Sequence, residues 1–501
     1  MDPDSTRLHQ LGYAQELRRT MSGFSNFAVS FTIISILSGC LTLYGFGLDT
    51  GGPAAMIWGW PLVGVFVVLV GLGMAEVCSS YPTAGGLYYW AAKLAPRRSA
   101  AAWSWFTGWF NLIGQVAVTA GIDFGAALFL NAFLDLQFGF AATPGHTILL
   151  LAIILVVHGL LNTFGVRLVA VLNNVSVWWH LTGVLVIVGV LVFVPDRHQS
   201  ASFVFGHFVN NTGWGFAPYV FALGLLVAQY TLTGYDASAH MTEETKNAAT
   251  AGPRGIVNSI LVSLVAGWIL LLGLTFAIQD YDGAVNTATG VPPAQIFLDA
   301  AGATTGKFLL LIAIGAQLFC GMASVTANSR MIYAFARDGA IPGSRVWHRI
   351  NKRTRTPTNS VWLSATGALI LALPYLWSAT AYAAVTSIAT VGLYVAYVIP
   401  VFLRVRKGAE FERGPWHLGR WGRPVGAVAT AWVVVIFVLF LLPQSYPVTV
   451  STFNYTPIAF LVVLGGAAVW WFASARKWFT GPKVQGTAAE LEAVERDLRA
   501  V

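Results

Sequence analysis

Long apolar stretches, separated by short polar segments, run along almost the whole chain. A helix needs roughly 17 to 25 apolar residues to cross the hydrocarbon core of a bilayer. Such stretches occur near residues 26–46, 56–81, 103–130, 147–164, 166–194, 218–236, 256–278, 308–335, 361–376, 381–403, 424–442 and 457–473. The pattern predicts an all-α membrane protein with 12 transmembrane helices.

Small and polar residues interrupt two of these stretches. The first span contains Ser38, Gly39 and Cys40, and the sixth span ends in Thr-Gly-Tyr-Asp at residues 233–236. Because lipid satisfies no backbone hydrogen bonds, non-helical backbone at this depth survives only where protein buries it or where it lines a cavity. The two interruptions therefore indicate a ligand site near the middle of the membrane.

The interruptions lie five spans apart, which predicts an internal repeat. An odd number of spans gives the two halves opposite orientations across the bilayer. We expect residues 24–195 to form a first inverted repeat (spans 1–5), residues 196–404 a second (spans 6–10) and residues 405–475 two further spans, with polar tails at residues 1–23 and 476–501. Secondary transporters are commonly built in this way and bind substrate near the midplane.

The distribution of positive charge fits this topology. If the N-terminus is cytoplasmic, only Arg197 and Lys307 of the 29 Lys and Arg residues fall on the outer side, as expected because positive residues are retained inside. Both termini are therefore predicted to be cytoplasmic, in a multi-pass protein of the cell membrane. Topology then explains the net charge of +8, so the expected partners are the lipid bilayer and a small-molecule substrate, and not nucleic acid.

The sequence contains no motif typical of an enzyme or of a metal site. Cys40, Cys78 and Cys320 lack metal-ligand spacing. Hydrolase, zinc-protease and phosphate-cradling motifs are also missing from the sequence. We expect neither a cofactor nor a metal, and an enzyme is not predicted.

Several motifs resemble those of the amino-acid/choline transporters in the amino acid–polyamine–organocation superfamily. They are FSNFA (24–28), SILSGC (35–40), YGFG (44–47), GGPA (51–54), AEVCSSYPTAGGLY (75–88), NNTGW (210–214), GYDAS (234–238) and RDGAIP (337–342). The resemblance extends from Phe24 to the twelfth span. It implies a leucine-transporter-like fold and alternating access, for substrates that include amino acids, 4-aminobutyrate, choline and polyamines.

The two interruptions supply the predicted substrate-binding residues, which are Ser38, Gly39, Cys40, Leu41, Gln229, Tyr230, Thr233, Gly234, Tyr235 and Asp236. Gly39 lets the backbone leave helical geometry at low steric cost. The N–H groups of Gly39, Cys40 and Leu41 would then bind a carboxylate at the start of the next half-helix. The alternative is a glycine kink packed against a neighbouring helix.

Asp236 lies near membrane depth, where an acid is costly and usually functional. It would receive a substrate ammonium, shuttle protons, or cap the short helix that follows. Tyr44, Tyr230 and Tyr235 would offer aromatic faces to a quaternary ammonium, although aromatic residues in such spans often serve packing alone. Choline therefore stays an alternative substrate.

Titratable and polar groups elsewhere suggest how transport would be driven. His180, in the middle of the fifth span, is the proton-coupling candidate because histidine titrates near neutral pH; the alternative is a neutral histidine bonded to a neighbouring helix. Asn111, Gln115 and Asn328 are candidates to line the cavity, or else link helices by hydrogen bonds.

A cytoplasmic gate is the last predicted feature. Glu243 and Glu244 follow the sixth span and face a side that is rich in arginine, including Arg337. Breaking and remaking such pairs would bias inward and outward states, whereas exposed pairs contribute only about 0 to 1 kcal/mol. A solvated surface is the alternative interpretation.

These observations together predict a secondary active transporter for an amino acid or a related small amine, for example 4-aminobutyrate. Proton symport with alternating access is the expected mechanism, so H+ is the expected coupling ion. An amino acid exchanger, or a choline or polyamine carrier of the same fold, is the alternative.

Overall fold

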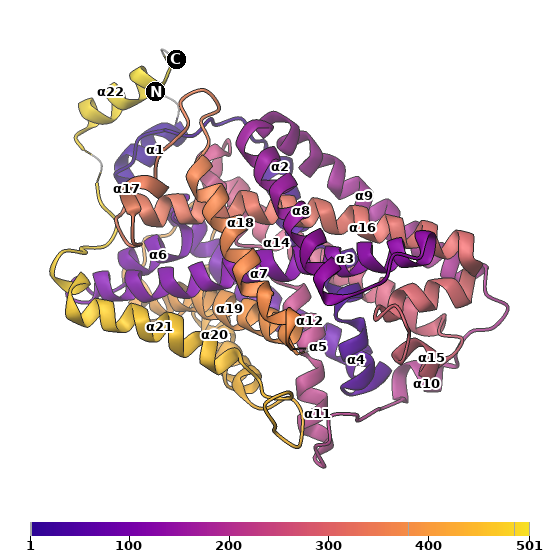
Figure 1. The fold of residues 1–501 in the computed structure, drawn as a ribbon. Coiled ribbons are helices and arrows are strands. Elements are labelled where there is room, and N and C mark those ends of the chain that lie inside the picture. Colours follow the sequence, from indigo (N-terminus) through magenta and orange to yellow (C-terminus); the bar gives the residue numbers. More distant parts are fainter. Residues whose placement is uncertain (1–2, 379, 485, 500–501) are drawn as a thin grey trace.

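The computed structural model describes residues 3–378, 380–484 and 486–499, and its regular structure in these ranges is helical (Figure 1). Eleven helices of the described residues are long and apolar enough to cross a membrane. A shorter apolar segment, Ala217–Thr231, lies at the position of the predicted sixth span. The predicted all-α membrane class is thus confirmed, with eleven full-length spans and one shorter segment.

The helices follow the predicted spans closely. The first half contains α2 (Gly23–Ile34), α3 (Ile36–Thr42), α4 (Tyr44–Asp49), α5 (Gly52–Ser80), α6 (Gly86–Leu94), α7 (Ala100–Phe138), α8 (Pro144–Phe164) and α9 (Val166–Phe193). The second contains α11 (Ala217–Gly224), α12 (Leu226–Thr231), α13 (Ala237–His240), α14 (Ala248–Phe276), α16 (Pro292–Arg337), α18 (Thr358–Ala372) and α19 (Ala381–Lys407). The chain continues with α20 (Gly422–Leu441) and α21 (Thr456–Ala473), and shorter helices are α1 (Pro3–Leu11), α10 (Ala201–Gly206), α15 (Tyr281–Val285), α17 (Ser344–Trp347) and α22 (Ala488–Arg499).

The first span is broken at Ser35, between α2 and α3. Ser35 adopts a left-handed conformation with φ 36° and ψ 82°, which is uncommon for any residue except glycine. Its carbonyl accepts hydrogen bonds from the N–H groups of Ser38 and Gly39 at 2.8 and 2.9 Å. The predicted break at Ser38, Gly39 and Cys40 is therefore wrong by about one helical turn, because these three residues lie inside α3.

The sixth span is broken where the sequence predicted it. Helix α12 ends at Thr231 and α13 begins at Ala237, and Gly234 between them has φ 90°. This conformation strongly favours glycine because a Cβ would clash with the backbone. The predicted position of the second break, at Gly234, is therefore correct.

Close packing of two other helices brings side chains to this break. Gly114 of α7 and Gly392 of α19 touch so tightly that a Cβ on Gly392 would lie 2.8 Å from the Gly114 Cα. Small residues allow membrane helices to approach to this distance. The contact places Gln115 of α7 and Tyr397 of α19 on either side of Asp236, to which both donate hydrogen bonds.

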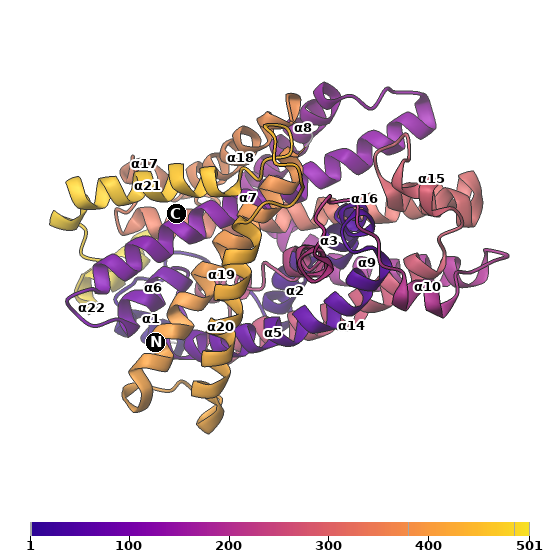
Figure 2. The same cartoon turned by 90° about the horizontal axis from the view of Figure 1, so that it is seen from below.

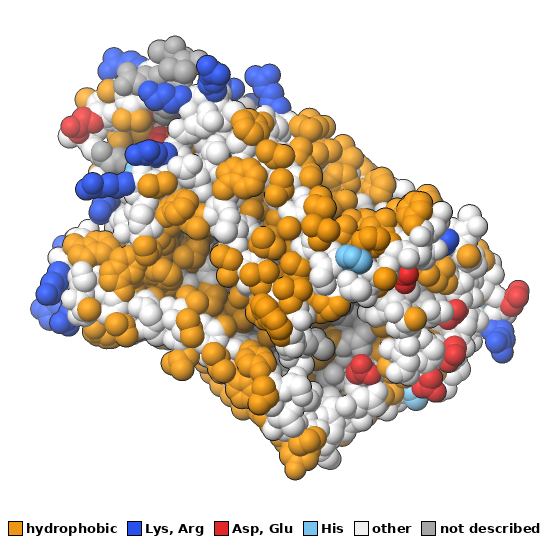
Figure 3. Space-filling model, viewed as in Figure 1, with side chains coloured by type: hydrophobic (Ala, Val, Ile, Leu, Met, Phe, Trp, Pro, Cys, Tyr) orange, Lys and Arg blue, Asp and Glu red, His pale blue; other side chains and the backbone are white. Residues whose placement is uncertain are grey.

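The outer surface is divided into charged ends and an apolar middle. Both termini lie at one end of the bundle, and α10 and α15 lie at the other (Figures 1 and 2). On the face shown in Figure 3, Lys and Arg gather near the termini, Asp and Glu gather at the opposite end, and apolar side chains cover the region between them. Helices α20 and α21 lie at the periphery and are among the least buried spans.

Candidate functional site

The two broken spans meet at a very small buried cavity. It is lined by Ile33, Ile34, Ser38, Gly39, Val118, Ile122, Tyr230, Thr231 and Thr233, and its volume is about 10 Å³. This is close to the smallest volume that holds one water molecule. Of the residues predicted to bind substrate, the structure brings Ser38, Gly39, Tyr230 and Thr233 together here.

Gly39 marks the point of closest contact between the broken spans. A Cβ at this residue would lie 2.5 Å from Thr231 Oγ1 and 2.8 Å from Thr231 Cα. The Gly39 N–H is bonded to the Ser35 carbonyl, and Cys40 and Leu41 are buried inside α3. The prediction that these three N–H groups are free for a carboxylate is therefore wrong, and the alternative of a glycine packed against a neighbour describes Gly39 better.

Two tyrosines of α19 hold the open backbone of the sixth span. Tyr397 Oη accepts a hydrogen bond from the Gly234 N–H at 3.1 Å and donates one to Asp236 Oδ1 at 2.6 Å. Tyr394 Oη donates to the Leu232 carbonyl at 2.5 Å. Buried backbone groups must be paired, so these phenols stabilise a break that lipid could not.

Asp236 is fully buried and is bound by side chains of two other helices. Gln115 Nε2 donates to Asp236 Oδ2 at 2.6 Å, and Tyr397 donates to the other oxygen. The carboxylate makes no hydrogen bond to the start of α13. The interpretation of Asp236 as a helix cap is therefore wrong, whereas a role in binding or proton transfer stays a prediction.

His240 is the nearest basic group to Asp236. Its Nε2 lies 3.2 Å from Asp236 Oδ2 and 3.3 Å from Asn111 Nδ2. Its Nδ1 lies 2.9 Å from the Ala84 carbonyl. A carbonyl only accepts hydrogen bonds, so Nδ1 carries a proton and Nε2 is the ring nitrogen that is free to gain or lose one.

His180 is also fully buried and lies beside the first break. Its Nδ1 donates to the Ser176 carbonyl at 2.8 Å, and its Nε2 lies 2.7 Å from Ser35 Oγ. Both ring nitrogens thus have partners when the imidazole is neutral. The geometry matches the alternative of a neutral histidine bonded to a neighbouring helix, and it ties His180 to the residue at which the first span breaks.

The other predicted residues lie further from the small cavity. Gln229 Oε1 accepts a hydrogen bond from Trp432 of α20 at 3.2 Å. The Tyr235 ring packs on the Tyr397 ring with centroids 4.8 Å apart. Asn328 Nδ2 donates to Ser364 of α18 at 2.7 Å and to Thr119 of α7 at 3.2 Å, so it links helices in the way that interhelical polar residues commonly do.

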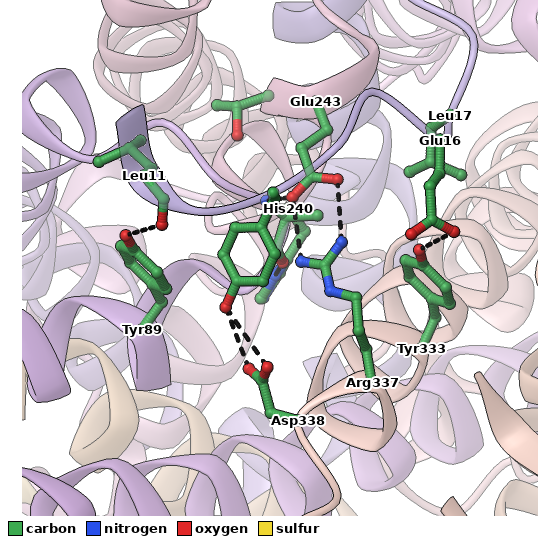
Figure 4. A network of polar contacts seen from close by, with 12 residues as sticks. Leu11, Glu16, Leu17, Tyr89, His240, Glu243, Tyr333, Arg337 and Asp338 are labelled. Atoms are coloured by element: carbon green, nitrogen blue, oxygen red, sulfur yellow. Dashed lines mark hydrogen bonds and ion pairs between the residues drawn. The ribbon is translucent and has the colours of Figure 1, made fainter. Parts of the chain in front are cut away.

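Buried ion pairs close the end of the bundle that carries the termini. Arg337 lies 3.3 Å from Glu243, and Arg330 lies 2.9 Å from Glu244. These glutamates are buried, so the alternative of a solvated surface is wrong for both. Figure 4 shows Glu243 and Arg337 facing each other beside His240.

An N-terminal segment, residues 3–22, covers the Glu243–Arg337 ion pair. Tyr13 lies against Arg337, with the guanidinium 3.9 Å from the ring centroid, and its hydroxyl donates to Asp338. Tyr333 donates to Glu16 at 3.0 Å, as Figure 4 shows. Burial raises the pKa of Asp338 above its usual range. The segment is therefore packed against the residues predicted to form a gate.

Larger cavities lie on both sides of the small one. A cavity of about 850 Å³ near the termini is lined by α2, the start of α9 and Arg330 of α16. A cavity of about 340 Å³ at the other end is lined by Phe46, Asp49, Thr212, Thr380 and Asn454 among others. The small cavity between the broken spans thus lies between two wider spaces.

Sequence reasoning missed His240, Tyr394 and Tyr397. The spacing of Asp236 and His240, four residues apart, is a readable signal because such residues share one helix face. A second buried acid–histidine pair, Asp123 and His158 at 3.2 Å, joins α7 to α8. Its two residues lie on different helices, so their spacing in the sequence does not reveal the contact. The two tyrosines carry no signal beyond their presence in an apolar span.

Two broken spans that meet at a small buried cavity, within a bundle of helices of membrane-spanning length, are typical of a multi-pass membrane transporter. The sequence model of the amino acid permease family matches residues 21–464. The chain belongs to the amino acid permease family, within the superfamily that its motifs indicated, and its relatives are named as permeases and not as enzymes.

Three relatives illustrate this similarity. The amino-acid permease BAT1 of Arabidopsis thaliana is 46% identical over 499 residues, which cover 96% of each chain. Its homolog from Oryza sativa subsp. japonica is 48% identical over 502 residues, again 96% of each chain. Amino-acid permease 2 of Neurospora crassa is 32% identical over 479 residues, covering 95% of this chain and 88% of the relative.

Proposed function

We propose that this permease carries an amino acid or a related small amine, such as 4-aminobutyrate, by proton symport with alternating access. The observation that carries the proposal is the meeting of the two broken spans at a small cavity lined by buried residues. Wider cavities lie toward each end. A carrier that opens one seal at a time would expose the same site to each side in turn.

The polar groups around the break suit a zwitterion or a small amine. Ser38 and Thr233 line the cavity, and the Asp236 carboxylate lies two residues beyond the glycine of the second break. An acid at this depth favours a cationic group. The names of the relatives, which are amino-acid permeases, agree with such a substrate.

We propose further that both termini face the cytoplasm of a cell-membrane protein. Lys and Arg gather at the end that carries both termini, as seen in Figure 3. Positive residues are retained on the cytoplasmic side during insertion. In this orientation the Glu243–Arg337 pair closes the cytoplasmic side.

Uptake into proteoliposomes tests the proposal. Purified protein would be offered radiolabelled L-alanine, L-glutamate, L-lysine, 4-aminobutyrate, putrescine and choline, with and without an inward proton gradient. We expect one amino acid or small amine to accumulate only when the gradient is present. Transport that needs preloaded substrate and ignores the gradient would favour exchange, and uptake of choline or putrescine alone would contradict the amino acid assignment.

A further inference from the structure

One pair of side chains at the second break is built to hold a single proton. His240 Nδ1 already donates to the Ala84 carbonyl, so only Nε2 can gain a proton. If Nε2 were bare and Asp236 were ionised, two lone pairs would face each other at 3.2 Å. One proton, on either atom, turns this contact into a hydrogen bond.

The neighbours of the pair accommodate the proton on either atom. Gln115 and Tyr397 donate to the two carboxylate oxygens. Asn111 faces Nε2, and its amide can present Nδ2 to a bare nitrogen or, after rotation, Oδ1 to a protonated one. The titratable groups that face Asp236 from packed elements are the phenols of Tyr394 and Tyr397 on α19 and of Tyr235 beside it.

We infer that Asp236 and His240 together form the binding site of the coupling proton. This inference rests on the proposed proton symport. A proton that enters from outside binds between Asp236 Oδ2 and His240 Nε2, crosses with the substrate, and leaves on the opposite side, so that the pair returns to its starting state. The pair lies directly after the backbone break, so its protonation acts on the part of the sixth span that must move.

His180 is less suited to this role. A second proton on its ring would sit at Nε2 beside the Ser35 hydroxyl, and no ion pair in the described ranges includes His180. An uncompensated charge inside the membrane is costly. His240 has its counter-ion in contact, which removes much of that cost.

Ala84 connects the proton site to the gate. Its carbonyl accepts the His240 Nδ1–H at 2.9 Å, and its N–H donates to Glu243 Oε1 at 3.0 Å. Glu243 in turn holds Arg337, as Figure 4 shows. A shift of the His240 ring on loss of the proton would therefore act, through Ala84, on the loop that holds Glu243.

Protons carried per substrate molecule provide the direct test. Proteoliposomes with a trapped pH-sensitive dye would report proton entry, while the radiolabelled amino acid that is best transported in the panel reports substrate entry. We expect proton entry in the wild type and its loss in Asp236→Asn and His240→Asn, whatever substrate flux they retain. Asp123→Asn is the matched control, because it alters a buried acid–histidine pair of the same separation that joins α7 to α8, and it should keep the ratio.

The outcomes separate the inference from the proposed function. No proton entry with the wild type would refute symport itself. If the wild type carries protons and both Asp236→Asn and His240→Asn keep the same number of protons per substrate, the pair is not the proton site. The inference is also overturned if only Asp123→Asn loses proton entry.

A spectroscopic measurement tests the inference if Asp236→Asn and His240→Asn take up no substrate. Protein labelled with [15N]histidine would be titrated in lipid nanodiscs, and the His240 signal would be identified by its absence in His240→Asn. We expect Asp236→Asn to alter the titration of that signal and Asp123→Asn to leave it unchanged. An unaltered titration in Asp236→Asn would overturn the inference.

Discussion

Gly39 of α3 lies directly against Thr231 of α12, with no room for a Cβ between the two helices. The two broken spans therefore touch each other through backbone and one small side chain. Any movement of one half-helix acts on the other at this point, and substitutions here should affect transport before they affect insertion.

Gly39→Leu is expected to abolish uptake while the protein still inserts and purifies as a single species. The new side chain would overlap Thr231, and overpacking of this kind costs about 1–3 kcal/mol. Substrate uptake and size-exclusion chromatography would be measured together. Gly466→Ala on α21 is the control, because a Cβ there meets no atom within 4 Å, and wild-type uptake in Gly39→Leu would refute the tight contact.

Gly234→Leu should also abolish uptake, for two separable reasons. A residue other than glycine at φ 90° is strained by about 1–3 kcal/mol, and a Cβ would lie 2.3 Å from Ile33 Cγ2. Gly290→Ala provides the comparison, because Gly290 has φ 66° but open space around it. If Gly290→Ala reduced uptake as strongly, backbone strain alone would explain the effect and the contact with Ile33 would be irrelevant.

Tyr397→Phe should reduce uptake and lower the thermal unfolding midpoint. It removes the acceptor of the Gly234 N–H and a donor to Asp236, and each buried group left unpaired costs about 1–3 kcal/mol. Tyr394→Phe removes the bond to the Leu232 carbonyl and leaves the bonds of Tyr397 to Gly234 and Asp236 in place, so it should have the smaller effect. The reverse order of the two variants would contradict the importance of Asp236.

His180→Ala separates two hypotheses about coupling. If His180 carried the proton, as its position in the sequence suggests, the variant would lose the pH dependence of uptake. The structure favours another result, because the variant removes the bond that holds Ser35. We expect slower uptake with an unchanged number of protons per substrate, measured with the same dye-loaded proteoliposomes.

Glu243→Gln should loosen the gate and the segment that covers it. Leaving Arg337 buried without its counter-charge costs on the order of 3–5 kcal/mol. The Glu243 backbone carbonyl accepts a hydrogen bond from Gln15 of the covering segment. A shift of Glu243 would weaken this bond, so we expect faster trypsin cleavage after Arg19 and a lower unfolding midpoint. Glu410→Gln, at an exposed position, should change neither quantity, and equal cleavage of both variants would argue against the gate.

The apolar pattern was sufficient to predict the helices, and Gly234 was sufficient to locate the second break. The first break was misplaced because Ser35 has no intrinsic preference for a left-handed conformation. Its hydroxyl is hydrogen-bonded to His180, which lies 145 residues away in the sequence, and a contact at this separation cannot be read from the local sequence. Gly39 signalled close packing, and a glycine alone does not distinguish packing from a break.

The polar partners of Asp236 were only partly predictable. Gln115 and Asn111 stood out as polar residues in an apolar span, but their targets depend on the contact between Gly114 and Gly392. The hydrogen bonds of Tyr394 and Tyr397 could not be predicted, because aromatic residues in membrane helices usually serve packing. Side-chain direction across helices is set by tertiary packing and cannot be inferred from one sequence.

The contact between Tyr13 and Arg337 has a practical consequence. Because residues 3–22 pack over the Glu243–Arg337 ion pair, a bulky tag fused ahead of them is expected to disturb these contacts and to reduce transport. Purification tags should therefore be placed at another position. Modification or tethering of residues 3–22 in the cell would offer a way to regulate the rate of transport.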